Sequence, residues 1–231
     1  MNISGHQKTS LIDYPGKVSS VIFTSNCNFY CPFCHNPDLI KPQLKLYEIP
    51  EKDILNYLKK RKKIIDGLVI TGGEPTIQPD LVSFIEKVKK EGFFVKLDTN
   101  GTNPEVLKKL FKKKLLDYVA MDIKSSEDKY QQATRTKVDV KKIKESIELI
   151  KKSGIDYEFR ATIVPTLHTK KEIEGIGKLM NNVNKFYVQQ FRPVRTLDPE
   201  FENIIPYDDE SLKSFARILN KYIKNVEIRG L

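Results

Sequence analysis

The stretch SNCNFYCPFCHNP, residues 25–37, sets the expectations for the whole chain. It holds Cys27, Cys31 and Cys34, which are the only three cysteines in the sequence. An odd, clustered set of thiols is a poor disulfide framework and is typical of metal ligands in a reducing compartment. Three thiolates at x3 and x2 spacing on one loop favour an iron–sulfur cluster, because three cysteines on four irons leave one iron open to a substrate.

Zinc is the alternative ligand for such a loop. A structural zinc site normally takes four protein ligands, and only His35 is at hand as a fourth. A zinc-binding interaction module therefore stays open as a second kind of function, which metal and sulfide analysis would separate from the first.

Short β-branched and apolar runs alternate with amphipathic segments along the chain. The runs predict strands at Val18–Thr24, Gly67–Thr71, Phe93–Asp98, Tyr118–Ile123, Tyr157–Val164 and Phe186–Phe191, with a shorter candidate at Asn225–Ile228. Apolar residues at helical spacing predict helices within residues 81–88, 106–111, 143–150 and 212–219.

Six βα units in series predict an α/β fold with a parallel sheet, because parallel neighbours need a crossover that a helix usually supplies. Six strands are too few for a complete eight-stranded barrel. The expected architecture is therefore a partial, open (β/α)6 barrel of the TIM type. The loops at the carboxyl ends of its strands should build the functional site.

Size and composition fit one soluble domain over residues 1–231. The chain weighs 26.7 kDa, with 39% hydrophobic and 30% charged residues, which is ordinary for a folded protein. No apolar run approaches the roughly 18 residues of a membrane span, and residues 1–10 lack the apolar core of a signal peptide. A cytoplasmic location is expected.

The formal net charge is +10, which can indicate nucleic acid or an acidic partner. The lysines, however, are spread over many segments, as solvated helix faces would be. Nucleic acid is therefore not expected as a partner, and without an apolar span a membrane is not expected either.

Three further motifs follow predicted strands. They are Thr71-Gly72-Gly73-Glu74-Pro75, Asp98-Thr99-Asn100-Gly101 and Ala120-Met121-Asp122-Ile123-Lys124. Glycines allow a tight turn and the close approach of a ligand, and Asp-Thr-Asn-Gly is also a good turn sequence. Taken singly, each motif has a purely structural explanation.

Taken together, the motifs resemble a known superfamily. C-x3-C-x2-C with Phe33 before the third cysteine resembles the radical S-adenosylmethionine (radical SAM) enzymes. Cys34-His35-Asn36 and the upstream Asp13-Tyr14-Pro15-Gly16 resemble the activating enzymes of glycyl-radical enzymes, and among these the anaerobic ribonucleoside-triphosphate reductase activating protein-like group. The resemblance covers most of the chain, with its specific motifs mainly between residues 13 and 124. It implies a single radical SAM domain over residues 1–231 with a cluster loop at residues 25–37.

The resemblance also implies the site. Cys27, Cys31 and Cys34 would hold a [4Fe–4S] cluster. S-adenosylmethionine would contact Phe33, His35, Gly72, Gly73, Glu74, Asp98, Thr99, Asp122, Lys124, Arg160, Thr162 and Arg192. The Gly-Gly-Glu motif would bind the amino group of the cofactor, and Lys124 would face its carboxylate. Asp98, Thr99 and Asp122, with the Ala120 carbonyl, would hold Na⁺ or K⁺.

Two details of this assignment are open to test. Arg192 stands where the pyruvate formate-lyase type of activating enzyme has a histidine, so its ribose contact departs from the family pattern. A bulky residue at Gly73 is expected to block the cofactor and leave the cluster intact. His6 and His168 have no partner pattern, and surface or capping roles are expected for them.

The implied function is a radical SAM activase that cleaves S-adenosylmethionine reductively and generates a glycyl radical on a partner enzyme, namely anaerobic ribonucleotide reductase. A flavodoxin- or ferredoxin-type donor would supply the electron. The alternative within the same superfamily is an enzyme that acts directly on a small molecule or on RNA, similar to 7-carboxy-7-deazaguanine synthase.

Overall fold

The computed structural model describes residues 1–40 and 47–231, and its strands form one eight-stranded sheet. The strands are β1 (Ile3–Ser10), β2 (Ser19–Thr24), β3 (Gly67–Gly72), β4 (Phe94–Thr99), β5 (Tyr118–Asp122), β6 (Asp156–Ile163), β7 (Phe186–Gln190) and β8 (Val226–Arg229). Their spatial order is their order in the sequence. β2 to β8 are parallel, and β1 pairs with β2 in the antiparallel sense.

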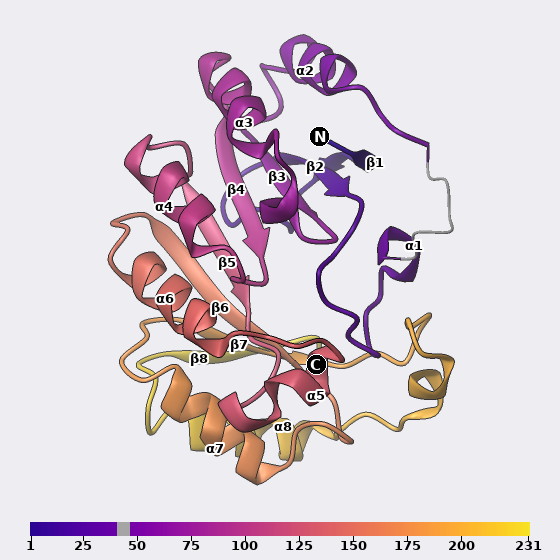
Figure 1. The fold of residues 1–231 in the computed structure, drawn as a ribbon, viewed down its shortest axis with the longest axis vertical. Coiled ribbons are helices and arrows are strands. Elements are labelled where there is room, and N and C mark those ends of the chain that lie inside the picture. Colours follow the sequence, from indigo (N-terminus) through magenta and orange to yellow (C-terminus); the bar gives the residue numbers. More distant parts are fainter. Residues whose placement is uncertain (41–46) are drawn as a thin grey trace.

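This order distinguishes a barrel from a doubly wound sheet. A doubly wound sheet reverses its strand order at a switch point, whereas here every crossover moves one strand in the same direction. In the described residues β1 and β8 are the two edges of the sheet, which curves without closing (Figure 1). The expected partial (β/α)6 barrel is therefore confirmed, because six helical crossovers connect β2 to β8.

Helices cover the outer side of the curved sheet, as Figure 1 shows. The helices are α1 (Pro37–Ile40), α2 (Glu51–Lys60), α3 (Leu81–Lys90), α4 (Pro104–Lys112), α5 (Tyr130–Thr134), α6 (Val140–Lys151), α7 (Lys170–Leu179) and α8 (Asp209–Leu219), with short 3₁₀ turns at Pro75–Ile77 (η1), Glu127–Lys129 (η2) and Pro199–Asn203 (η3). Each crossover helix turns its apolar face inward; Phe84, Ile85 and Val88 of α3, for example, are fully buried. Together with the outward residues of the strands they form the main hydrophobic core.

The inner face of the sheet is divided. On the side of β2 and β3 it carries a small apolar cluster that includes Tyr14, Val21 and Val69. The cluster continues through Tyr118 and Ala120 of β5. On β4, Val95 and Leu97 face the helices, and the alternate residues Lys96 and Asp98 face the interior as charged groups. The barrel interior therefore combines an apolar cluster with charged residues of β4 and β6.

Five elements were not anticipated from the sequence: β1, α2, α7 and the short helices α1 and α5. β1 has only two buried residues, Ile3 and Ser10, and its polar middle gives no apolar alternation. The helices α2 and α7 carry only two buried aliphatic side chains each, Ile54 and Leu58 in one and Ile173 and Ile176 in the other. None of the helices in the described part of the chain combines the length and the apolarity needed to cross a membrane.

Candidate active site

The carboxyl ends of the strands surround one cavity of about 590 Å³. Its lining includes all fifteen residues that the sequence singled out: Cys27, Cys31, Phe33, Cys34, His35, Gly72, Gly73, Glu74, Asp98, Thr99, Asp122, Lys124, Arg160, Thr162 and Arg192. They come from the loops or ends of six successive strands, β2 to β7. Residues up to 165 positions apart are thus brought to a single site.

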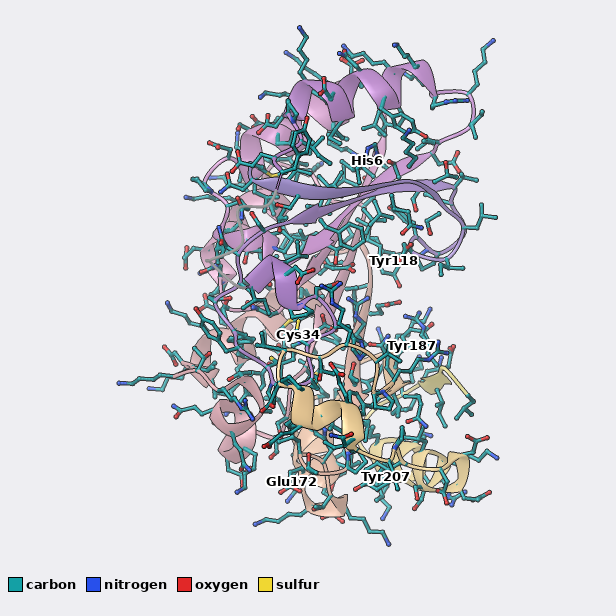
Figure 2. All side chains as sticks on the ribbon, turned by 90° about the vertical axis from the view of Figure 1, so that its right-hand side faces the viewer. His6, Cys34, Tyr118, Glu172, Tyr187 and Tyr207 are labelled. Carbon is teal, nitrogen blue, oxygen red and sulfur yellow. The ribbon has the colours of Figure 1, made fainter. Side chains whose placement is uncertain are left out.

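The loop after β2 brings the three thiols to the cavity wall. Cys31 is 5% exposed, and the backbone N–H groups of Phe29 and Asn36 donate to the sulfurs of Cys27 and Cys34 at 3.4 Å. Burial raises the pKa of Cys27 and of Cys31 to about 12 in the metal-free protein, so binding a metal would release their protons. Figure 2 shows Cys34 near the middle of the molecule, between the part that holds His6 and the part that holds Tyr207.

A single metal ion is a poor match for these side chains. In residues 1–40 and 47–231, no three His, Cys, Asp or Glu side chains are grouped closely enough to hold one ion. A [4Fe–4S] cluster does not require such a grouping, because each of its cysteines binds a different iron. The donor set of three thiols on one loop fits a cluster.

The Gly72-Gly73 pair lets the β3 loop pack against the cysteine loop. Gly72 has φ +114°, and Gly73 N–H and Glu74 N–H donate to the carbonyls of Thr24 and Asn26. A Cβ atom on Gly73 would lie 1.9 Å from the Asn26 oxygen, one residue before Cys27. The expectation that a bulky residue at Gly73 leaves the cluster intact is therefore wrong: it would displace the cysteine loop itself.

Glu74 is almost entirely buried, with 1% exposure. Its Oε1 accepts hydrogen bonds from the Thr76 N–H and from the Thr76 and Thr99 hydroxyls, and its Oε2 accepts one from the Asn100 N–H at 2.6 Å. Burial raises the pKa of this carboxyl, and the hydrogen bonds offset only part of the rise. In this arrangement Glu74 joins the ends of β3 and β4.

Arg160 bridges the two aspartates near the carboxyl ends of β4 and β5, Asp98 and Asp122. Its Nε donates to Asp122 at 2.7 Å and its Nη2 to Asp98 at 3.0 Å. Lys96 Nζ lies 2.5 Å from Asp98, and Lys124 Nζ lies 3.7 Å from Asp122. Burial would raise the pKa of Asp122, but Arg160, Lys124 and Lys96 together outweigh it and hold that pKa at about 2.

The same interior contains two ionised residues that sequence reasoning missed, Glu158 on β6 and Arg229 on β8. They form a bidentate ion pair, and Arg229 lines the cavity. The signal that could have found Glu158 is the alternation Glu158, Arg160, Thr162, which puts polar side chains on one face of β6.

The segment after β7, residues 191–204, covers the cysteine loop from outside. The backbone N–H groups of Leu197 and Asp198 donate to the carbonyls of Cys34 and Pro32 at 3.0 Å. The ring of His35 is stacked on Phe191, and its Nε2 is 2.8 Å from the Arg192 carbonyl oxygen. This places His35, one of the expected cofactor contacts, between the cysteine loop and the covering segment.

His168 is not at the surface. It is fully buried; its Nδ1 accepts a hydrogen bond from the Val164 N–H, and its Nε2 is 2.9 Å from the Lys124 carbonyl oxygen. It therefore joins the ends of β5 and β6, and the surface role expected for it is corrected. His6 contacts the Ser20 hydroxyl, between β1 and β2.

Comparison with known proteins agrees with this geometry. The family model described as the radical SAM superfamily matches residues 21–180, more than two thirds of the chain. This chain belongs to the radical SAM superfamily. The match includes the cysteine loop, the Gly-Gly-Glu turn and both aspartates, so the chain is an enzyme of this class and the zinc-binding interaction module is set aside.

Relatives narrow the family further. A protein of Methanocaldococcus jannaschii, provisionally named a glycyl-radical enzyme activating enzyme, is 40% identical over 99% of this chain and 96% of its own length. A pyruvate formate-lyase-activating enzyme of Clostridium pasteurianum is 26% identical over 95% of both chains. The chain therefore belongs to the glycyl-radical enzyme activating enzymes among the radical SAM proteins.

Among solved structures, Streptococcus suis SuiB bound to S-adenosylmethionine has a TM-score of 0.69 and 18% identity. The likeness covers 91% of this chain and half of SuiB. At this level of identity it supports the radical SAM fold alone. Membership of the superfamily implies a [4Fe–4S] cluster and S-adenosylmethionine as cofactors.

Proposed function

We propose that this radical SAM protein activates a glycyl-radical enzyme, and that anaerobic ribonucleotide reductase is its partner. The observation that carries the proposal is the convergence of all fifteen expected residues on one cavity, with three thiols in its wall.

Cys27, Cys31 and Cys34, which line the cavity, would hold the cluster. When bound, the cluster supplies the electron that cleaves S-adenosylmethionine to methionine and a 5′-deoxyadenosyl radical. Burial of Cys31 and of the neighbouring Phe29 and Phe33, all at most 5% exposed, would keep water away from the reacting centre.

The charged groups of the cavity would orient the cofactor. Lys124 and Arg160 offer positive charge to its carboxylate, and Asp98 and Asp122 offer negative charge to its ammonium and sulfonium groups. Because Glu74 already accepts four hydrogen bonds, it would act chiefly by fixing the loop that presents the Gly72 and Gly73 main chain.

A monovalent cation at Asp98, Thr99 and Asp122 remains a proposal. The Thr99 hydroxyl donates to Glu74, and Arg160 bridges both carboxylates, so an ion would have to displace the guanidinium. Cofactor cleavage measured in K⁺, Na⁺ and tetramethylammonium salts of equal ionic strength would reveal such an ion.

The partner would present a glycine-bearing loop to the open cavity, and remote contacts would position it for hydrogen abstraction. A flavodoxin- or ferredoxin-type protein would deliver the electron. The test is to incubate the reconstituted enzyme with purified anaerobic ribonucleotide reductase and, separately, with other glycyl-radical enzymes. A radical doublet that forms fastest on the reductase supports the partner. Turnover of a purified pterin or nucleoside, with no radical on any glycyl-radical enzyme, would instead favour direct action on a small molecule.

A further inference from the structure

A buried ion pair ties the last strand to the middle of the sheet. Glu158 of β6 is 1% exposed, and it accepts hydrogen bonds from Arg229 Nη1 at 2.7 Å and Nη2 at 2.9 Å. The hydroxyl of Tyr118 donates a third, at 2.9 Å. Bidentate arginine–carboxylate pairs are among the strongest and most directional polar contacts in proteins. Neither residue has a part in the function described so far.

Arg229 reaches Glu158 by crossing the strand between them. Its Cα is in register with Gln189 of β7, and its guanidinium lies over the ring of Tyr187, 3.2 Å from the centroid. Tyr118 and Tyr187, both labelled in Figure 2, come from β5 and β7, on the two sides of β6. The side chain therefore fastens the edge strand β8 to β6 across β7.

Glu158 also stands next to Arg160. The two are alternate residues of β6 and share the inner face, and Arg160 Nη1 lies 3.8 Å from the Glu158 carboxylate. The other guanidinium nitrogens of Arg160 bond Asp122 and Asp98. Arg160 is thus held by three carboxylates. Glu158 lies between the guanidinium group of Arg160 and that of Arg229.

Loss of the Glu158 charge would change this balance. Arg160 and Arg229 would then face each other with no carboxylate between them, and the like charges would repel at short range in a site of low polarity. Arg160 would shift away from β8, and the geometry of its contacts to Asp98 and Asp122, which line the cavity, would change.

We propose that Glu158 and Arg229 are positioning residues, which hold Arg160 against Asp98 and Asp122 and thereby set the affinity for S-adenosylmethionine. This rests on the proposed function, in which these three residues orient the cofactor. The strand β8 then belongs to the cofactor site, although it is four strands from Asp98 and six from the cysteine loop.

The test compares Glu158→Gln, Arg229→Gln and Arg229→Lys in the anaerobically reconstituted enzyme. Glu158→Gln and Arg229→Gln should each weaken S-adenosylmethionine binding about tenfold, as the loss of one well-placed ion pair does. Arg229→Lys keeps the charge without the two-pronged geometry and should fall between. Because the two residues act as one unit, the double variant should bind no more weakly than Glu158→Gln alone.

Iron and sulfide content, with the spectrum of the reduced cluster before the cofactor is added, should stay as in the wild type in all variants. Glu86→Gln, which breaks the exposed Lys113 ion pair, is the matched control and should change nothing. If Glu158→Gln does not fold, the affinities of Arg229→Gln and Arg229→Lys for S-adenosylmethionine test the proposal. Wild-type affinity in folded variants that only melt earlier would overturn the proposal. A wild-type protein that binds no S-adenosylmethionine would overturn the proposed function itself.

Discussion

Single residues at the ends of β3 and β4 hold the cysteine loop in place. Gly73 packs against the Asn26 backbone, and Glu74 links this turn to Thr99 and Asn100 through its hydrogen bonds. The Gly-Gly-Glu turn therefore does two things at once: it leaves room for a ligand, and it supports the loop that carries Cys27. A substitution there should act on both.

Gly73→Ala should impair the cluster loop even without cofactor. The new Cβ would meet the Asn26 oxygen, and overpacking of this kind costs about 1–3 kcal/mol or more. We expect a lower melting temperature of the metal-free protein and a lower iron content after reconstitution. Gly154→Ala is the matched control, because Gly154 has a positive φ but nothing within 4 Å of its Cβ position. Equal iron content in the two variants would contradict the account.

Asp122 should make the fold sensitive to acid. Its pKa is lowered from 3.8 to about 2, because Arg160 and the nearby lysines Lys124 and Lys96 together outweigh burial. A carboxyl with a depressed pKa stabilises the folded state fully above its unfolded pKa, and the contribution is lost as the pH falls through the folded value. The melting temperature of the metal-free protein should therefore fall between about pH 4 and pH 2.

Asp122→Asn removes this titration and separates its effect from general acid unfolding. The melting temperature of the variant should lie below that of the wild type at pH 7, and the gap should narrow as the pH approaches 2. A gap that stays constant from pH 7 to pH 2 would show that Arg160 does not stabilise the ionised carboxylate.

At the scale of elements, the inner face of each strand determines what the barrel can do. β2 and β3 direct apolar residues inward. By contrast, β4 directs Lys96 and Asp98 inward, and β6 directs Glu158 and Arg160 inward. The carboxyl ends of these strands could be located from the sequence, because β-branched runs mark the strands and polar motifs follow them. The ion pairs could not, because partners lie on different strands and only the register brings them together.

The covering segment, residues 191–204, is the second such element. Its hydrogen bonds to Cys34 and Pro32 are backbone contacts, which cannot be predicted from the pattern of side chains in the sequence. His35 was expected only as a cofactor contact, and the stacked Phe191 ring gives it a structural partner as well. The segment is therefore expected to slow the release of the cluster.

His35→Ala should make the cluster easier to remove. A lost hydrogen bond and ring contact are worth about 1–2 kcal/mol together, which corresponds to roughly tenfold faster loss of iron to a chelator. The rate is measured by bleaching of the cluster absorbance under anaerobic conditions, without cofactor. Val194→Ala, at a position 69% exposed in the same segment, should bleach at the wild-type rate. The prediction fails if the two variants bleach alike.

At the scale of the whole molecule, the sequential strand order leaves the sheet open between β1 and β8 within the described residues. The α/β class and the partial barrel followed from the sequence, because six βα units leave few alternatives. The antiparallel strand β1 could not be predicted from the sequence. It is an edge strand with a polar middle that is held by backbone pairing with β2, and such pairing leaves no pattern of apolar residues. An open sheet suits a substrate that is itself a folded protein, which can insert one loop and keep the rest outside.

The most direct test of the central claim is the fate of the hydrogen atom taken from the partner. Anaerobic ribonucleotide reductase is prepared with glycine deuterated at Cα and mixed with reconstituted enzyme, S-adenosylmethionine and a reductant; Cys31→Ala is the control. The account predicts deuterium in 5′-deoxyadenosine, and a glycyl radical whose doublet, seen with ordinary glycine, collapses in the deuterated protein. 5′-Deoxyadenosine without deuterium, and no radical on the reductase, would contradict it.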